Sequence, residues 1–392
     1  MENSISIPVL PLELVTEILS RLPVKSLLKF KCASKSWLAL ISSPEFVKTH
    51  LRLNANNNEY TRRHNKVMMF ERIVMFERIV PSFRDCSVSS LYNNSCIEAN
   101  DLHYHRQVPH CAYTVGSVNG LICLVSREKE LILWNPSIRK YKKLPTPKIK
   151  TTLGYCLYSF GYDEFRDDYK VVVLWNDNLS RQIEVKKYSL KRDSWRWVDN
   201  CPSMEPLSQA GNFVNGKIYW ITTIHPNTRS IISIDLADGK WGEMELPCYW
   251  KGRIDVFFSF GVLAVLESDL LIWCGCVETD MVDVWLRKEY GVKESWMKMF
   301  TINIPRDPSV YGYLEPIRLY MASGSEILVV LGSKFMIYNL KGDQLRSSKV
   351  INSYNWDEEE IYIESLVCPF SMVGTEDATK MVMKSLGCET MK

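Results

Sequence analysis

The sequence predicts an α+β protein with two domains, a small helical module at the N-terminus and a much larger all-β domain behind it. Apolar residues recur at helical spacing only within about the first fifty residues. From about residue 110 onward, short apolar runs alternate with Gly, Asn, Asp and Pro, as in sheet proteins. Within that part, one strand-and-turn unit returns about every fifty residues, which indicates a repeat architecture.

The bulk composition is that of an ordinary globular protein. The 392 residues are 46% hydrophobic and 24% charged, so disorder is not expected. The net charge of +3 gives no electrostatic case for nucleic acid or for an anionic membrane surface. The 12 cysteines contain no C-x-x-C pair and are expected to stay reduced. We see no secretory signal and no apolar run long enough for a membrane span, so we expect a cytoplasmic or nuclear location.

The first predicted helix begins at Leu10 and is stopped by Pro23. Leu14, Ile18 and Leu22 recur every fourth residue and form one apolar face. Two more short helices are predicted around residues 27–31 and 35–41, and Ser34 is a suitable N-cap for the second of them. A module of about 45 residues buries little surface, so it should need a neighbour to complete its core.

The same residues carry a specific motif, which reads Leu10-Pro11-x-Glu13-Leu14-x-x-Glu17-Ile18-Leu19-x-Arg21-Leu22-Pro23 and continues to Trp37, with a further block at residues 40–46. Over more than twenty positions the module resembles the F-box of plant F-box proteins. The resemblance implies binding to a Skp-type adaptor, which ties a receptor to a cullin and a RING subunit. Phe30, Trp37 and Ile41 are expected to fill the module's own core. The adaptor contacts that the resemblance implies are Leu10, Pro11, Leu14, Ile18, Leu22, Pro23 and Leu27.

We predict the helical module over residues 1–53, a polar linker over 54–66, the β domain over 67–370 and a tail over 371–392. Near the start of the β domain, the six residues 69–74 are repeated at once as residues 75–80. A copy of six residues preserves strand facing, because six is even and the strand period is two. The copy would therefore either lengthen a strand or loop out, and we attach no function to it.

The repeated units of the β domain begin at residues 131, 183, 231, 282 and 335. Between them lie further strand pairs, two of which carry Asn-Gly (residues 119–120 and 215–216), the strongest short hairpin signal. About four strands per fifty residues fits a blade of a kelch-like β-propeller. A sixth unit could combine residues 65–110 with residues 361–367, so that the two ends close the ring. A pair of packed β sheets is the alternative.

The β domain also resembles a known family, through Gly120-Leu121, Trp134-Asn135-Pro136-Ser137 and segments at residues 160–163, 168–171, 282–285 and 362–366. These motifs are similar to the F-box-associated domain that follows plant F-boxes. The resemblance implies a non-catalytic, substrate-recognition subunit of an SCF-type ubiquitin ligase, whose β domain holds a target protein. Two groups share these motifs: S-locus F-box proteins, which act in pollen against pistil ribonucleases, and F-box/kelch-repeat proteins, some of which limit immune-receptor levels.

Residues that could carry chemistry form only weak patterns. His103, His105, His110 and Cys111 lack a second ligand pair at zinc spacing, so a surface loop is favoured over a metal site. The carboxylates Asp163, Glu164, Asp167 and Asp168 are expected to form a solvated hairpin turn rather than an acid–base pair. We predict no cofactor.

Two other functions stay open at this point. One is a propeller scaffold outside any ligase, which binds a protein or a glycan and uses the helices for dimerisation. The other is an enzyme built on a propeller, which would need convergent polar residues at the central channel. No target-contact residue is assigned from the sequence.

Overall fold

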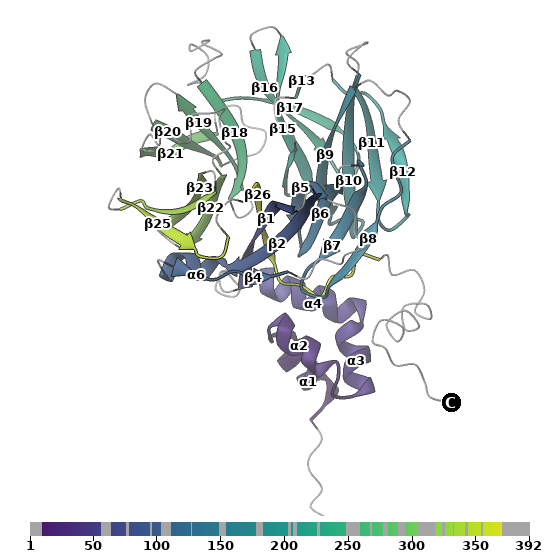
Figure 1. Cartoon of the computed structure of the whole chain (residues 1–392). Coiled ribbons are helices and arrows are strands. Elements are labelled where there is room, and N and C mark those ends of the chain that lie inside the picture. Colours follow the sequence, from purple (N-terminus) through teal and green to yellow (C-terminus); the bar gives the residue numbers. More distant parts are fainter. Residues whose placement is uncertain are drawn as a thin grey trace, which may run out of the picture.

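The computed structural model contains a small group of helices packed beneath a ring of six β-sheets (Figure 1). This arrangement confirms the predicted α+β class with a β-propeller, and it excludes the alternative of two packed sheets. The structure describes residues 10–55, 64–75, 78–94, 96–102, 111–126, 128–148, 154–177, 183–202, 205–206, 210–225, 228–247, 259–266, 269–276, 281–288, 295–303, 318–323, 326–331, 333–341, 344–353 and 356–370.

In the described residues 10–55, the N-terminal module contains four helices. They are α1 (Leu12–Ser20), α2 (Val24–Phe30), α3 (Lys35–Ser42) and α4 (Pro44–Ala55). The side chain of Ser34 caps α3 as predicted, because its hydroxyl oxygen accepts a hydrogen bond from the Trp37 backbone N–H at 3.1 Å. The predicted linker is shorter at both ends, since Asn54 still belongs to α4 and Asn65 already begins the first strand.

Blades 1 to 3 follow the helices, each named here from its inner to its outer strand. Blade 1 is β26 (Glu358–Ile363), β1 (Asn65–Met75), β2 (Arg78–Ser87) and β4 (Asn100–Asp101). Blade 2 is β5 (Cys111–Val118), β6 (Leu121–Ser126), β7 (Leu131–Asn135) and β8 (Lys140–Lys143). Blade 3 is β9 (Gly154–Asp163), β10 (Asp168–Asp177), β11 (Ile183–Ser189) and β12 (Ser194–Val198).

Blades 4 to 6 complete the ring. Blade 4 is β13 (Glu205–Pro206) and β14 (Asn212–Val214), both paired with β15 (Lys217–His225), then β16 (Thr228–Asp235) and β17 (Trp241–Glu245). Blade 5 is β18 (Ser259–Leu266), β19 (Asp269–Cys276), β20 (Met281–Arg287) and β21 (Trp296–Asn303). Blade 6 is β22 (Arg318–Ser323), β23 (Glu326–Leu331), β24 (Lys334–Asn339), β25 (Gln344–Val350) and β3 (Cys96–Ile97).

The repeated unit seen in the sequence is the third strand of a blade. The five predicted starts fall in β7, β11, β16, β20 and β24. Both Asn-Gly pairs form the hairpins expected of them, between β5 and β6 and between β14 and β15. Asn119 and Gly120 have φ values of 55° and 80°, the left-handed geometry that a two-residue hairpin turn requires.

Apolar side chains fill all six spaces between neighbouring blades, because the strands are covered on both faces. Along β10, for example, Val171 and Val173 face blade 2, whereas Val172 and Leu174 face blade 4. The last space lies between blades 6 and 1, where Phe335 and Ile337 pack with Val67 and Met69. The ring is therefore closed by side-chain packing as well as by strand pairing.

Backbone pairing at the ring closure joins the two ends of the β domain. β26 pairs antiparallel with β1, from Asn65 opposite Ile363 to Phe70 opposite Glu358. A second link comes from β3, which pairs in parallel with β25 of blade 6. Along the chain, the helix α6 (Val88–Asn93) lies between β2 of blade 1 and β3. The predicted sixth unit is thus confirmed, although its C-terminal strand lies earlier than residues 361–367.

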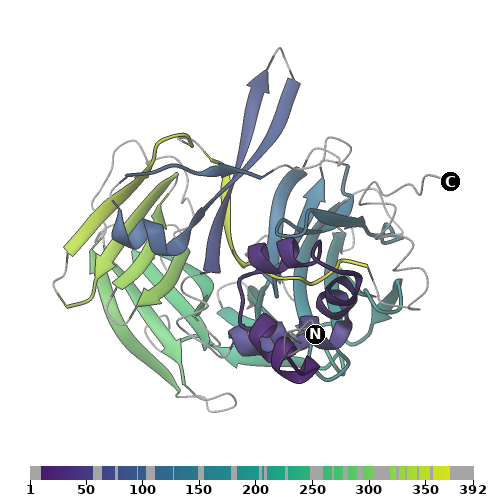
Figure 2. The same cartoon turned by 90° about the horizontal axis from the view of Figure 1, so that it is seen from below.

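The duplicated segment forms a long hairpin. The first copy lies in β1, and the second copy supplies the last residue of β1 and the start of β2, with Ile73 opposite Val80. β26 pairs with β1 only as far as Phe70, so the hairpin extends beyond the sheet, and Figure 2 shows it projecting from the ring. Of the two outcomes considered from the sequence, the longer strand is the one observed.

Candidate protein-interaction surface on the N-terminal helices

The helix α1 presents apolar side chains to solvent. Leu10, Leu14 and Ile18 are 55%, 47% and 53% exposed, and Leu12 beside them is exposed as well. The opposite side of α1 packs inward through Leu19, which is buried. A helix in a soluble domain normally turns its apolar stripe toward the core, so an outward stripe of this kind indicates a surface that binds another protein.

Local contacts keep this exposed helix regular. Pro11 stands before the first helical residue, and its carbonyl oxygen accepts the hydrogen bond of the Val15 N–H at 3.1 Å. Glu13 lies in the first turn, where a negative charge favours the helix dipole. Arg21 and Glu17 form an exposed ion pair at 2.9 Å, an arrangement that adds only about 0.3–0.5 kcal/mol. These contacts favour the helical conformation of the segment that carries the exposed apolar side chains.

The structure separates the seven predicted contact residues into three groups. Leu10, Pro11, Leu14 and Ile18 are exposed on or just before α1. Leu22 and Pro23 are half-buried where α1 gives way to α2. Leu27 is fully buried in the apolar cluster that the helices share with the β domain. Its side chain does not reach the surface, so its position does not support a direct contact.

Phe30, Trp37 and Ile41 lie where a core role requires them. Ile41 is fully buried, and the rings of Phe30 and Trp37 meet edge to face with their centroids 5.3 Å apart. Both aromatic residues pack on the outside of the same cluster. The expectation that the module needs a neighbour to complete its core is met in part by the chain's own β domain.

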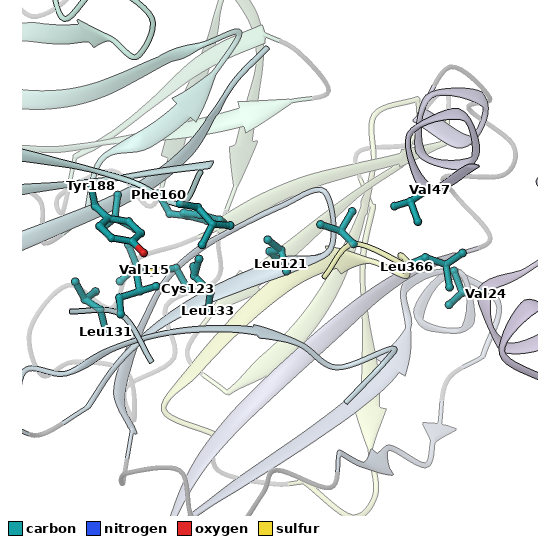
Figure 3. Packing of buried hydrophobic residues seen from close by; sticks show 14 of the residues in the cluster. Val24, Val47, Val115, Leu121, Cys123, Leu131, Leu133, Phe160, Tyr188 and Leu366 are labelled. Carbon is teal, nitrogen blue, oxygen red and sulfur yellow. The ribbon is translucent and has the colours of Figure 1, made fainter. Parts of the chain in front are cut away.

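One apolar cluster runs from the helices into blades 2 and 3. Val24 and Val47 of the helices lie beside Leu366, and Leu121 of blade 2 continues the row toward the ring (Figure 3). The helical module and the propeller therefore share a single core. Their relative orientation follows from packing, which a flexible linker would not provide.

A polar contact joins the same two parts at the turn between β9 and β10. The Lys48 ammonium of α4 lies 2.5 Å from a carboxylate oxygen of Asp167, and the Tyr162 hydroxyl donates to the other oxygen at 2.5 Å. Burial alone would raise the pKa of Asp167, but the hydrogen bonds from Lys48 and Tyr162 outweigh it and hold this pKa below its usual value.

Of the four carboxylates predicted to form a solvated hairpin turn, Glu164 is exposed and Asp167 partly exposed, but the other two differ from the prediction. Asp163 and Asp168 are buried rather than solvated. Asp163 accepts a hydrogen bond from the Arg166 backbone N–H at 3.0 Å, and Asp168 accepts one from the Ser189 hydroxyl at 2.5 Å. Lys170 lies 2.5 Å from Asp168. Each carboxylate thus has hydrogen-bond and cationic partners that fix its position, which suits a structural role.

Two basic side chains of the helical module are perturbed by burial. Desolvation lowers the pKa of His50, whose Nε2–H donates to the Leu22 carbonyl oxygen at 2.9 Å. Burial, together with the positive charge of Lys140 in blade 2, lowers the pKa of Lys31 to about 8.

The described residues offer little that could carry chemistry. They include no cluster of three or more metal-binding side chains, and His103, His105 and His110 lie outside them. Across the same ranges, the helices are all too short or too polar to cross a membrane. An open pocket of about 470 Å³ lies on the outer part of blade 3, beside Glu184 and the half-exposed Trp197.

The fold and this surface define a class of protein, in which a helical module with an exposed apolar face is fixed to a closed propeller. The chain belongs to the family described by the F-box associated beta propeller domain, whose model matches residues 64–370, and the F-box domain model matches residues 7–49. The described helices α1 to α3 fall within the F-box match.

Proteins of Arabidopsis thaliana resemble the chain over almost its whole length. The F-box/kelch-repeat protein At3g23880 is 30% identical over 92% of this chain and 96% of its own length. The F-box protein CPR1 is 26% identical over 91% of this chain and 88% of its own length. The similarity therefore includes both domains and their order. An F-box followed by a propeller is the general architecture of a substrate-recognition subunit of an SCF-type ligase.

Proposed function

We propose that this chain binds a Skp-type adaptor through the exposed face of α1, and through it a cullin and a RING subunit. The observation that carries the proposal is the outward apolar stripe of Leu10, Leu14 and Ile18 within the F-box match. Covering a half-exposed leucine or isoleucine contributes about 1 kcal/mol, so a few such side chains form an adequate central anchor.

The proposed contact set is narrower than the set implied by the sequence. Leu10, Pro11, Leu14 and Ile18 contact the adaptor directly, and Leu12 joins them because it is exposed beside them. Leu22 and Pro23 border this surface. Leu27 supports it only from within the core.

The propeller, in the same proposal, holds the target protein. The chain itself performs no chemistry and instead brings a target close to the ubiquitin-carrying subunits, which raises the effective concentration of the reacting groups. This role suits the cytoplasm or the nucleus. A pistil ribonuclease and an immune receptor are the target classes that the family resemblance suggests, and we assign no contact residue to either.

The proposal is tested by measuring adaptor affinity with purified proteins. Leu14→Asp places a charge in the centre of the stripe, where docking would bury it without a partner, at a cost of about 3 kcal/mol or more. We expect binding at least ~100-fold weaker than for the wild-type chain, measured by biolayer interferometry against a plant Skp-type adaptor.

Leu53→Asp is the matched control. Leu53 is a partly exposed leucine of the same module, but it lies on α4 and outside the proposed surface. The Leu53→Asp variant should bind the adaptor with a Kd within about twofold of the wild-type value. Equal losses for both variants would contradict the assigned surface. A folded wild-type chain that fails to bind would contradict the receptor function and favour a scaffold that binds a protein or a glycan.

A further inference from the structure

The last described residues form a C-terminal segment, residues 364–370, that leaves the ring after β26 and runs between blade 2 and the F-box. Leu366 and Val367 of this segment are buried in the cluster shared by the two domains. Figure 3 shows Leu366 directly beside Val24 of α2, with Val47 of α4 close by. The F-box helices α2 and α4 therefore pack against this segment.

One buried side chain of blade 2 holds the segment in place. Asn135, at the end of β7, is fully buried. Its Nδ2 group lies within hydrogen-bond distance of the Ser365 carbonyl oxygen (3.1 Å), the Ser365 hydroxyl (3.1 Å) and the Val367 carbonyl oxygen (2.8 Å). Its Oδ1 atom accepts from the Ser137 N–H at 2.9 Å, which fixes the orientation of the amide.

The hairpin turn between β5 and β6 provides the second wall for the segment. A Cβ atom on Gly120 would lie within 3 Å of both the Ser365 hydroxyl and the Ile363 carbonyl oxygen, so only glycine leaves room for the chain. The Ser137 hydroxyl accepts a weak hydrogen bond from the Ser365 N–H at 3.4 Å. Ser365 thus lies in a fitted recess made by Gly120, Asn135 and Ser137.

The polar contacts described above between the F-box helices and blades 2 and 3 contribute less. The ion pair between Lys48 and Asp167 has partly exposed side chains, and such pairs contribute about 0–1 kcal/mol. Lys31 of the module and Lys140 of blade 2 are both positive and repel each other. The C-terminal segment adds buried hydrogen bonds and apolar contacts at this junction.

We propose that the C-terminal segment sets the orientation of the F-box on the propeller, and that Asn135 is the positioning residue that holds this segment. The inference deepens the proposed function, on which its biological meaning rests. A receptor of this kind would act as a rigid spacer, which fixes where a bound target lies relative to the adaptor. Ubiquitin transfer depends on such positioning, because misplaced reacting groups meet less often.

Asn135→Asp tests the assignment with almost no change in shape. The substitution keeps the acceptor for Ser137 but replaces the donor amide by an oxygen that faces two carbonyl oxygens. The matched control is Asn339→Asp, because Asn339 ends the third strand of blade 6 and caps its turn in the same way, with Oδ1 accepting from the Lys341 N–H at 2.9 Å.

The readout is the distance distribution between the two domains, measured by single-molecule energy transfer. Fluorophores would replace exposed Lys35 on α3 and exposed Lys240 beside β17, introduced as unnatural amino acids. We expect one narrow population for the wild type and for Asn339→Asp. For Asn135→Asp we expect loss of that population to a broad one, at temperatures where near-UV circular dichroism is unchanged.

An unchanged narrow population in folded Asn135→Asp overturns the proposal. If that variant does not fold, Ser365→Ala decides in its place, since it removes the hydroxyl from the recess and leaves every apolar contact. A broadened population for Ser365→Ala supports the assignment, and a wild-type distribution overturns it. None of these measurements includes the adaptor, so a failed adaptor-binding test would overturn the proposed function without changing this result.

Discussion

The helix α1 and the strand β7 are both rich in leucine and isoleucine, yet the fold uses these residues in opposite ways. In β7, Leu131, Ile132 and Leu133 are almost completely buried, because neighbouring blades cover both faces of the strand. In α1, Leu14 and Ile18 remain about half exposed, because the propeller covers only the other side of the module. The same residue types therefore stabilise the fold in one region and stay available for a partner in the other.

The strongest test of this contrast compares two leucine-to-alanine substitutions. Leu133→Ala should reduce the free energy of unfolding by about 3 kcal/mol, because it removes buried methyl groups and leaves a cavity. Leu14→Ala should change it by less than about 0.5 kcal/mol, since its side chain is already in contact with water. Urea unfolding followed by tryptophan fluorescence measures both, and similar losses would contradict the contrast.

A second test concerns buried polar groups in the propeller. The Tyr362 hydroxyl of β26 donates to a carboxylate oxygen of Asp85 in β2 at 2.6 Å, and both residues are buried. Tyr362→Phe should cost about 2 kcal/mol of unfolding free energy, because it takes a donor from a buried carboxylate. Tyr155→Phe, at a partly exposed hydroxyl, is the control and should cost less than about 0.5 kcal/mol. Equal effects would show that burial does not decide the cost.

The helical module contains a buried histidine, His50, whose protonation links stability to pH. His50 has a pKa lowered from 6.5, so the unfolded chain binds a proton more readily than the folded chain as the pH falls through that value. Stability contributed by the neutral ring is present above about pH 7 and is lost toward pH 5.5. Between these two values, the wild type should lose more unfolding free energy than His50→Gln.

This difference is the smallest effect expected here. Linkage limits it to about 1.4 kcal/mol for one proton over one pH unit below the unfolded pKa. Chemical unfolding of both proteins at pH 7.5 and 5.5 measures it, and the remaining histidines cancel in the comparison. Equal losses in the two proteins would contradict a buried neutral His50.

Local sequence chemistry predicted the parts of the fold that depend on near neighbours. The Asn-Gly hairpins, the Ser34 cap and the third strands of the blades follow from turn geometry and strand periodicity, which a short window of sequence contains. The outward stripe of α1 also followed from spacing. The assignment of its residues to adaptor binding stays a prediction.

Features that depend on residues far apart in the sequence were harder to predict. β26 begins with Glu358, Glu359 and Glu360, a run that does not resemble an inner strand until β1 is placed beside it. Leu27 was assigned to the adaptor by the family resemblance, and nothing in the sequence shows that its side chain enters the cluster shared with the propeller. Asp168 was predicted to be solvated because two of its partners, Ser189 and Lys191, come from the next hairpin.

Because the chain is synthesised from its N-terminus, the ring can close only when translation is almost finished. β1 leaves the ribosome early, but its partner β26 is made almost three hundred residues later. At about 5–20 residues per second, the first blade waits roughly 15–60 s for its inner strand. During that time the F-box helices are already complete, while the segment on which they rest does not yet exist. A chain terminated early would therefore carry an F-box with no finished propeller behind it, so only nearly full-length translation products have both domains in their final arrangement.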